Sequence, residues 1–135
     1  MILVDTNILI DIVTGDPVWA DWSRLQLDAA RAIDEIAINE VVYAEICAGY
    51  RRHEQVDRLV ARTGIALTRT TRPALFLAGR AFHHYRRAGG TRTGVLPDFF
   101  IGALAYVSGA KLLTRDPRPY RTYFPGVELI APDHC

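Results

Sequence analysis

Four carboxylates stand at places in this chain where a carboxylate is difficult to bury: Asp5, Glu45, Asp98 and Asp116. Asp5 and Asp116 follow apolar runs, and Asp98 opens a strongly apolar segment. Glu45 has apolar or small helical neighbours and is therefore expected to point inward. A buried charge without a partner is costly, and no lysine or arginine has a spacing that would pair with all four. If the fold brings them together, a hard divalent cation is their natural partner.

The other potential metal ligands do not compete with these oxygens. A softer metal would require histidine or cysteine, yet His83 and His84 are adjacent and point to different sides of a helix. His53 and His134 lie in polar surroundings, which favours a surface position. The two cysteines, Cys47 and Cys135, are too few for a disulfide framework or a thiolate site.

Each acid also has an ordinary structural interpretation. Asp5 and Asp116 could cap helices, and Glu45 could pair with an arginine. Asp98 would be stabilised by the dipole at a helix N-terminus, by about 0.3–1 kcal/mol. Each signal alone is weak, but the four together favour a cation site over four separate structural roles.

The elements that must position these acids can be predicted from apolar patterns and breaks. Strands are expected at 1–4, 36–38, 65–67, 111–114 and 127–130. Helices are expected from residue 5 to the break at 15–17, at 18–33, 40–50, 51–63, 72–88 and 97–108, with a helical turn from 116. This alternation predicts one α/β domain over residues 1–135, with a short central parallel sheet flanked by helices on both faces. Ligands of such sheets bind beyond the carboxyl ends of the strands, where Asp5 and Asp116 would lie.

Composition sets broader limits. The chain has 135 residues, half of them hydrophobic, which suits one globular domain. The net charge of +1 makes no case for nucleic acid. Every basic residue except Lys111 is an arginine, which favours bidentate phosphate contacts, although a codon bias would have the same result. No apolar run approaches the ~18 residues of a membrane span, and the N-terminus lacks the pattern of a signal peptide. We expect a cytoplasmic protein.

Several segments resemble the PIN-domain ribonucleases, and most closely the VapC-type toxins of bacterial toxin–antitoxin pairs. They are residues 2–11, 41–46, 96–103, 112–116 and 120–125. The resemblance implies an acidic quartet of Asp5, Glu45, Asp98 and Asp116 that binds Mg²⁺ or Mn²⁺ and cleaves single-stranded RNA. It also implies help near the metal from Asn7 and Thr114, homodimers, and neutralisation by a cognate antitoxin. Thr6 and Asn7 are expected to hold the loop after Asp5.

An RNA substrate requires positive charge near the acids. The candidate phosphate contacts are arginines close to the acids in sequence, in the glycine-rich loop at 89–94, or in adjacent pairs: Arg92, Arg115, Arg51, Arg52, Arg86 and Arg87. For each of them a solvated surface position is the simpler interpretation.

Three other classes of function can be compared with the sequence. A haloacid-dehalogenase-like phosphohydrolase would use Asp5 as a covalent nucleophile and a second aspartate two residues later, where this chain has Asn7. A receiver domain would need a lysine in a place that Lys111 does not occupy. A PIN-like scaffold that binds RNA or protein without cleaving would not need intact acids.

Overall fold

A single parallel sheet forms the centre of the protein. The computed structural model describes residues 1–92 and 94–132, so the predictions for His134 and Cys135 lie outside the described residues. The sheet has the strand order β3-β2-β1-β4-β5. Its strands are β1 (Ile2–Val4), β2 (Ile36–Asn39), β3 (Ala66–Thr68), β4 (Lys111–Leu113) and β5 (Leu129–Ile130). The predicted α/β class with a short central parallel sheet is confirmed.

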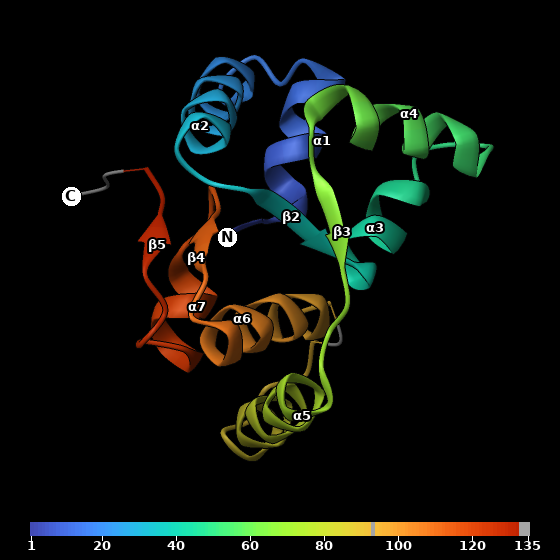
Figure 1. Cartoon of the computed structure of the whole chain (residues 1–135). Helices are drawn as coiled ribbons and strands as arrows, with labels where there is room; N and C mark the ends of the chain where they lie inside the picture. Colours follow the sequence, from blue (N-terminus) through green and yellow to red (C-terminus); the bar gives the residue numbers. More distant parts are fainter. Residues whose placement is uncertain (93, 133–135) are drawn as a thin grey trace.

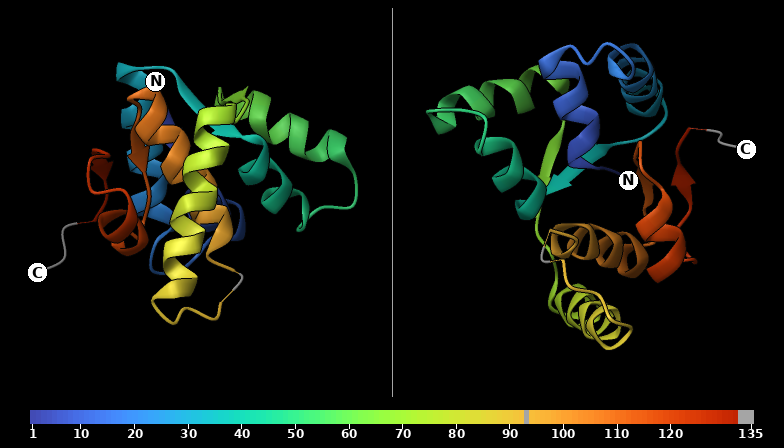
Figure 2. Two further views of the ribbon diagram at one scale, coloured as in Figure 1. Left: turned by 90° about the horizontal axis from the view of Figure 1, so that it is seen from below. Right: turned by 180° about the vertical axis from the view of Figure 1, so that it is seen from behind.

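Helices cover both faces of this sheet, as predicted. They are α1 (Thr6–Thr14), α2 (Ala20–Ile33), α3 (Glu40–Cys47), α4 (His53–Thr63), α5 (Arg72–Arg87), α6 (Leu96–Ser108) and α7 (Arg118–Tyr123). From β1 through β2 to β3 the chain moves toward one edge of the sheet, and from β3 through β4 to β5 it moves toward the other edge. Because the crossovers between parallel strands are right-handed, this reversal places α1–α4 on one face of the sheet and α5–α7 on the other. Figure 1 shows the first group above the sheet and the second below it, and Figure 2 shows the same arrangement from two other sides.

Capping residues account for several element boundaries. The Asp5 carboxylate accepts a hydrogen bond from the Thr6 N–H and caps α1, which ends at Gly15 in the left-handed conformation. Asn39 caps α3 through the Val42 N–H. The turn predicted from Asp116 is a helix that begins later, at Arg118, and Asp116 is not its cap. The last strand is also shorter than predicted.

The register of the central strands determines where the acids emerge. Val4 of β1 pairs with Leu113 of β4, so Asp5 and Thr114 leave the sheet side by side. The chain leaves β1 toward β2 on one side and leaves β4 toward β5 on the other side. The order of the strands therefore reverses between β1 and β4, and open α/β sheets bind ligands at the carboxyl ends of the strands at such a switch point. The three residues of β1 are fully buried and hold this edge rigidly.

None of the helices described has both the length and the apolar character that a bilayer crossing requires.

Gly102 allows α6 and α7 to approach each other closely. A Cβ at this position would lie 2.5 Å from Phe124 Cδ2 and 3.1 Å from Tyr120 Cδ1. Both rings are buried, so neither can turn aside without disturbing the core. Gly102 therefore determines the position of Tyr120, whose contacts with the acids are described below.

We predict that Gly102→Ala lowers the free energy of unfolding by about 1–3 kcal/mol through overpacking. Gly79→Ala is the matched control, because Gly79 also lies in a helix but a Cβ there meets no atom within 4 Å. The control should raise stability by about 0.5–1 kcal/mol. Urea denaturation of both variants measures the difference, and equal effects in the two would contradict the packing argument.

Candidate active site

Asp5 is the centre of a hydrogen-bond network at the end of β1. The residue is 5% exposed. Its Oδ2 accepts hydrogen bonds from the Tyr120 hydroxyl at 2.7 Å and the Thr114 hydroxyl at 2.8 Å, while Oδ1 accepts one from the Thr6 N–H at 2.7 Å. Burial raises the pKa of Asp5, and these hydrogen bonds oppose the rise. Three separate elements thus hold one carboxylate in a fixed orientation.

The segment after β4 is tied to the same carboxylate through Thr114. Its buried hydroxyl, which donates to Asp5, accepts the Asp116 N–H at 3.1 Å. Asn7 links the two loops, because its Nδ2 lies 3.4 Å from Asp5 Oδ2 and its Oδ1 accepts the Arg115 N–H at 3.2 Å. The structure therefore places Asn7 and Thr114 beside the acids, where the resemblance implied them.

Asp98 approaches Asp5 from the face of the sheet that α5–α7 cover, opposite to the face that carries α1. It lies in the first turn of α6, and its Oδ1 is 3.4 Å from the Tyr120 hydroxyl that donates to Asp5. Burial, followed by the negative charges of Asp5, Glu45 and Asp116, raises the pKa of Asp98 to about 7. Burial and the charges of Asp5 and Asp98 also raise the pKa of Tyr120 well above its usual value, so its hydroxyl remains a donor.

Glu45 reaches the site from the side of α3. The sequence predicts that it points toward the core, but the residue is exposed. Its carboxylate turns to Thr6, whose hydroxyl donates to Oε1 at 2.6 Å. Partial loss of water around this carboxylate raises the pKa of Glu45, the Thr6 hydrogen bond opposes the rise, and the charge of Asp5 adds to it. The partner of Glu45 is therefore a threonine and not an arginine.

Asp116 is partly exposed and is the one acid of the four with an arginine partner in the described residues. Its side chain is 42% exposed and pairs with Arg118, whose Nε lies 3.0 Å from Oδ1. The Arg118 side chain is 86% exposed, and ion pairs at such exposure contribute little free energy. Arg118 would therefore compete only weakly with a metal ion for the Asp116 carboxylate.

The charge balance of this cluster fits a divalent cation. Within residues 1–92 and 94–132, no basic group forms an ion pair with Asp5, Glu45 or Asp98. The pKa values of these three acids are all raised. The acids therefore lie together at the end of β1 without a positive charge to balance them. Over the same residues, however, no three acidic, histidine or cysteine side chains stand close enough to form a completed metal site. The donors suit Mg²⁺ or Mn²⁺, but some carboxylates must turn to close around the ion.

Arg115 is bound to another acid. Its Nε and Nη2 donate to the two oxygens of Asp11 at 2.8 and 3.0 Å, and its guanidinium lies over the ring of Trp19. Ser23, which is fully buried, also donates to Asp11. This bidentate pair anchors the β4–α7 segment to α1 and α2.

The remaining candidate arginines lie apart from this pair. Arg51 and Arg52 precede α4, Arg86 and Arg87 end α5, and the Arg92 N–H donates to the Tyr85 hydroxyl. None of these five side chains contacts one of the four acids in the part of the chain that the structure describes. Their role in RNA binding stays a prediction.

Sequence reasoning missed two residues at this corner. Asp11 interrupts the apolar run Ile8–Val13, and the argument applied to Glu45 would have identified it as a buried acid in need of a partner. From sequence alone, Tyr120 is expected in the core or at an interface, with no role at the acids. It is in the core, but a buried tyrosine hydroxyl needs a hydrogen-bond acceptor, and here the acceptor is Asp5.

Comparison with known proteins agrees with this architecture. The family model for the PIN domain matches residues 2–125. Ribonuclease VapC19 of Mycobacterium tuberculosis is 31% identical over 120 residues, which cover 89% of this chain and 92% of that protein.

Solved structures share the fold across their full length. VapBC2 from Rickettsia felis, bound to a DNA fragment from its promoter, matches with a TM-score of 0.74 at 22% identity and covers 98% of this chain and 100% of the other. A toxin–antitoxin complex from Klebsiella pneumoniae matches with a TM-score of 0.67 at 24% identity, with all of both chains covered. From the family model and the curated relative together, the chain belongs to the PIN-domain family.

Proposed function

We propose that this protein is a metal-dependent endoribonuclease, the toxin of a toxin–antitoxin pair. The observation that carries the proposal is the group of Asp5, Glu45 and Asp98 at the switch point of the sheet, with raised pKa values and no cationic side chain to neutralise them. The similarity to a ribonuclease over nearly the whole chain supports RNA as the substrate.

Asp5 and Asp98 are the principal ligands in this proposal. Both are in contact with the hydroxyl of Tyr120; Asp5 lies between β1 and α1, and Asp98 lies in the first turn of α6. Glu45 would complete the ligand set directly or through water, and Asp116 would bind a second ion or orient water. A bound Mg²⁺ or Mn²⁺ would supply positive charge for the phosphate and lower the pKa of water.

The side chains around the acids position the ligands and the reactants. Tyr120 and Thr114 hold the orientation of Asp5, and Thr6 holds that of Glu45. In the hydrolysis that we propose, water oxygen bonds to phosphorus, the bond between phosphorus and the 3′-oxygen breaks, and that oxygen receives a proton. Asp116, which is accessible to solvent, would accept the proton that water loses. No side chain forms a covalent bond to the substrate.

The proposed partners are an antitoxin and a second copy of the chain. The structural neighbours include toxin–antitoxin complexes, which supports the antitoxin. Several apolar side chains are 40–75% exposed, as on a protein with docking surfaces. They include Ile10 and Val13 on α1, and Leu75, Phe76, Tyr106 and Val107 on α5 and α6, beside others such as Val18, Leu25, Ile33 and Leu67.

We predict that the purified protein, free of antitoxin, cleaves single-stranded RNA with Mg²⁺ and that EDTA abolishes the cleavage. Asp98→Asn should lower kcat at least about 100-fold, because it removes one of the ligand charges. Asp21→Asn is the matched control, since Asp21 is an exposed acid on α2 away from the cluster, and it should keep full activity.

The same assay tests the other classes of function. Cleavage that persists in EDTA would contradict the metal mechanism. Release of phosphate from small phosphomonoesters would identify a phosphohydrolase, and retention of RNA without cleavage in Mg²⁺ or Mn²⁺ would identify a binding scaffold.

We also predict that Asp98 makes the metal-free protein less stable as the pH rises. The pKa of Asp98 is about 7 in the folded protein and about 3.9 in the unfolded chain. Between these values the unfolded chain releases the proton while the folded protein keeps it, so unfolding becomes easier. Below about pH 4 this contribution is absent, and above about pH 7 it is constant.

Thermal denaturation in EDTA at pH 5 and pH 7.5 measures this effect. Asp98→Asn should gain stability relative to the parent by about 1–2 kcal/mol more at pH 7.5 than at pH 5, after allowance for partial exposure. Asp21→Asn should show no such difference. Mg²⁺ should raise the Tm of the parent at pH 7.5 more than that of Asp98→Asn. An identical pH profile for parent and Asp98→Asn would refute the assignment.

A further inference from the structure

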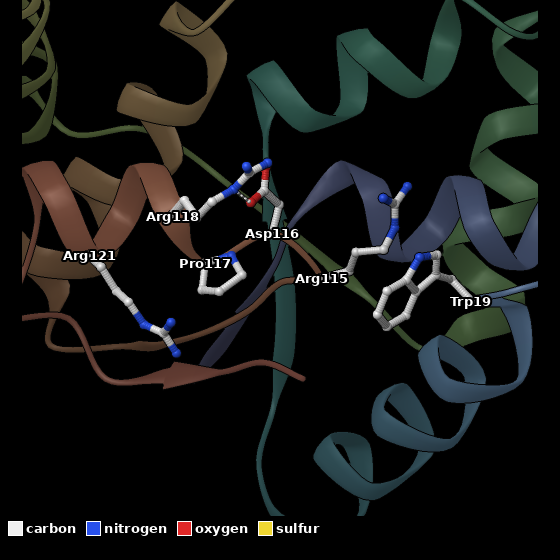
Figure 3. A pocket seen from close by; sticks show the side chains of 6 residues that line it. All are labelled: Trp19, Arg115, Asp116, Pro117, Arg118 and Arg121. Atoms are coloured by element: carbon white, nitrogen blue, oxygen red, sulfur yellow. Dashed lines mark hydrogen bonds and ion pairs between the residues drawn. The ribbon is translucent and has the colours of Figure 1, made fainter. Parts of the chain in front are cut away.

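A hollow of about 390 Å³ is lined by Asp116 but by none of the other three acids. Its lining contains three arginines and a tryptophan; the full set is Trp19, Arg115, Asp116, Pro117, Arg118 and Arg121. Figure 3 shows Trp19 and Arg115 on one side, Arg121 on the other, and Asp116 with Arg118 between them. The volume lies within the range of small-ligand sites and suits a single nucleotide rather than a duplex.

Arg115 and Trp19 form one wall of the hollow (Figure 3). The Arg115 guanidinium is held by two hydrogen bonds to Asp11, whose side chain is only 2% exposed. Its carbon lies 5.9 Å from the centre of the Trp19 ring. Because Nε and Nη2 already bind Asp11, Arg115 is poorly suited to grip a phosphate. Guanidinium planes and aromatic rings are instead the surfaces on which single-stranded bases stack.

The opposite side supplies charge that is not already neutralised. Arg115 pairs with Asp11 and Arg118 pairs with Asp116, whereas Arg121 is exposed and forms no ion pair in the part of the chain that the structure describes. An exposed guanidinium next to an acidic cluster offers a bidentate contact to a phosphate oxygen.

We infer that this hollow is a subsite for the nucleotide adjacent to the scissile phosphate of single-stranded RNA. The base lies against the wall of Trp19 and Arg115, and its backbone phosphate binds Arg121. Asp116 links the subsite to the acids, so the RNA crosses from the acidic cluster over the β4–α7 segment. The inference rests on the proposed function, because the subsite is defined by its position next to the cleaved bond.

The test measures binding of a fluorescein-labelled, 12-nucleotide single-stranded RNA of mixed sequence to Asp98→Asn protein, which keeps the RNA intact. In this background Arg121→Gln should weaken binding about five-fold or more and reduce the slope of log K against log salt by about 0.7, the value for one phosphate on a single strand. Arg58→Gln is the matched control, since Arg58 is an exposed arginine on α4 that also forms no ion pair within the described residues.

A second pair of variants tests the stacking wall. Trp19→Leu keeps an apolar side chain but removes the ring, and it should weaken binding about five-fold or more. Trp19→Phe retains a ring and should restore most of the affinity. Trp19 and Trp22 are the only tryptophans of the chain, so RNA should quench the fluorescence of a protein that also carries Trp22→Phe. Circular dichroism and Tm confirm that each variant is folded.

The outcomes separate the subsite from the proposed function. If Arg121→Gln and Trp19→Leu bind RNA as tightly as their background while that background binds well, the subsite is refuted and the nuclease is untouched. Equal affinity for an RNA duplex or a DNA duplex of the same sequence would refute single-strand recognition. If the wild-type protein cleaves no RNA, but Arg121→Gln and Trp19→Leu weaken RNA binding in the Asp98→Asn background as predicted, the hollow is an RNA site and the nuclease assignment fails.

Discussion

Repulsion among carboxylates at one end of the sheet is the constraint on which this structure depends. Asp5, Glu45 and Asp98 lie close enough for their charges to interact, and their partners are hydroxyls rather than cations. A protein gains no stability from such an arrangement, because both burial and like charge disfavour ionisation. Sites of this kind are where function and stability conflict, and a divalent cation would remove the conflict.

The fold tolerates this repulsion because hydroxyl groups surround the acids. Tyr120, Thr114 and Thr6 donate hydrogen bonds to Asp5 or Glu45, and they come from different parts of the chain. A hydroxyl stabilises a carboxylate without neutralising its charge, so the attraction for a cation is kept. A cationic partner in place of these hydroxyls would neutralise the carboxylates and compete with the ion. The one strong ion pair of this corner, Asp11 with Arg115, lies beside the cluster and anchors it.

A neutralised arginine can still contribute to recognition. Arg115 was expected to bind RNA by its charge, but its charge is compensated by a buried aspartate and its plane is fixed over Trp19. In the proposed subsite, Arg115 and Trp19 therefore provide a surface for stacking, and Arg121 on α7 provides the positive charge that binds a phosphate. The same helix carries Tyr120, which touches Asp5 and approaches Asp98. The acidic cluster and the proposed subsite therefore share one short helix.

The sequence by itself determined the strand and helix order, the parallel sheet and the identity of the acids. Apolar runs that end at Asp5 and Asp116 are local signals, and strand direction then places both at one edge. Contacts that depend on side-chain direction were decided only by the tertiary structure. Glu45 is exposed instead of inward, Arg115 binds Asp11, and the Tyr120 hydroxyl reaches Asp5 across 115 positions. Such contacts depend on how α1, α3 and α7 pack on the sheet, and residue spacing along one chain carries no information about that packing.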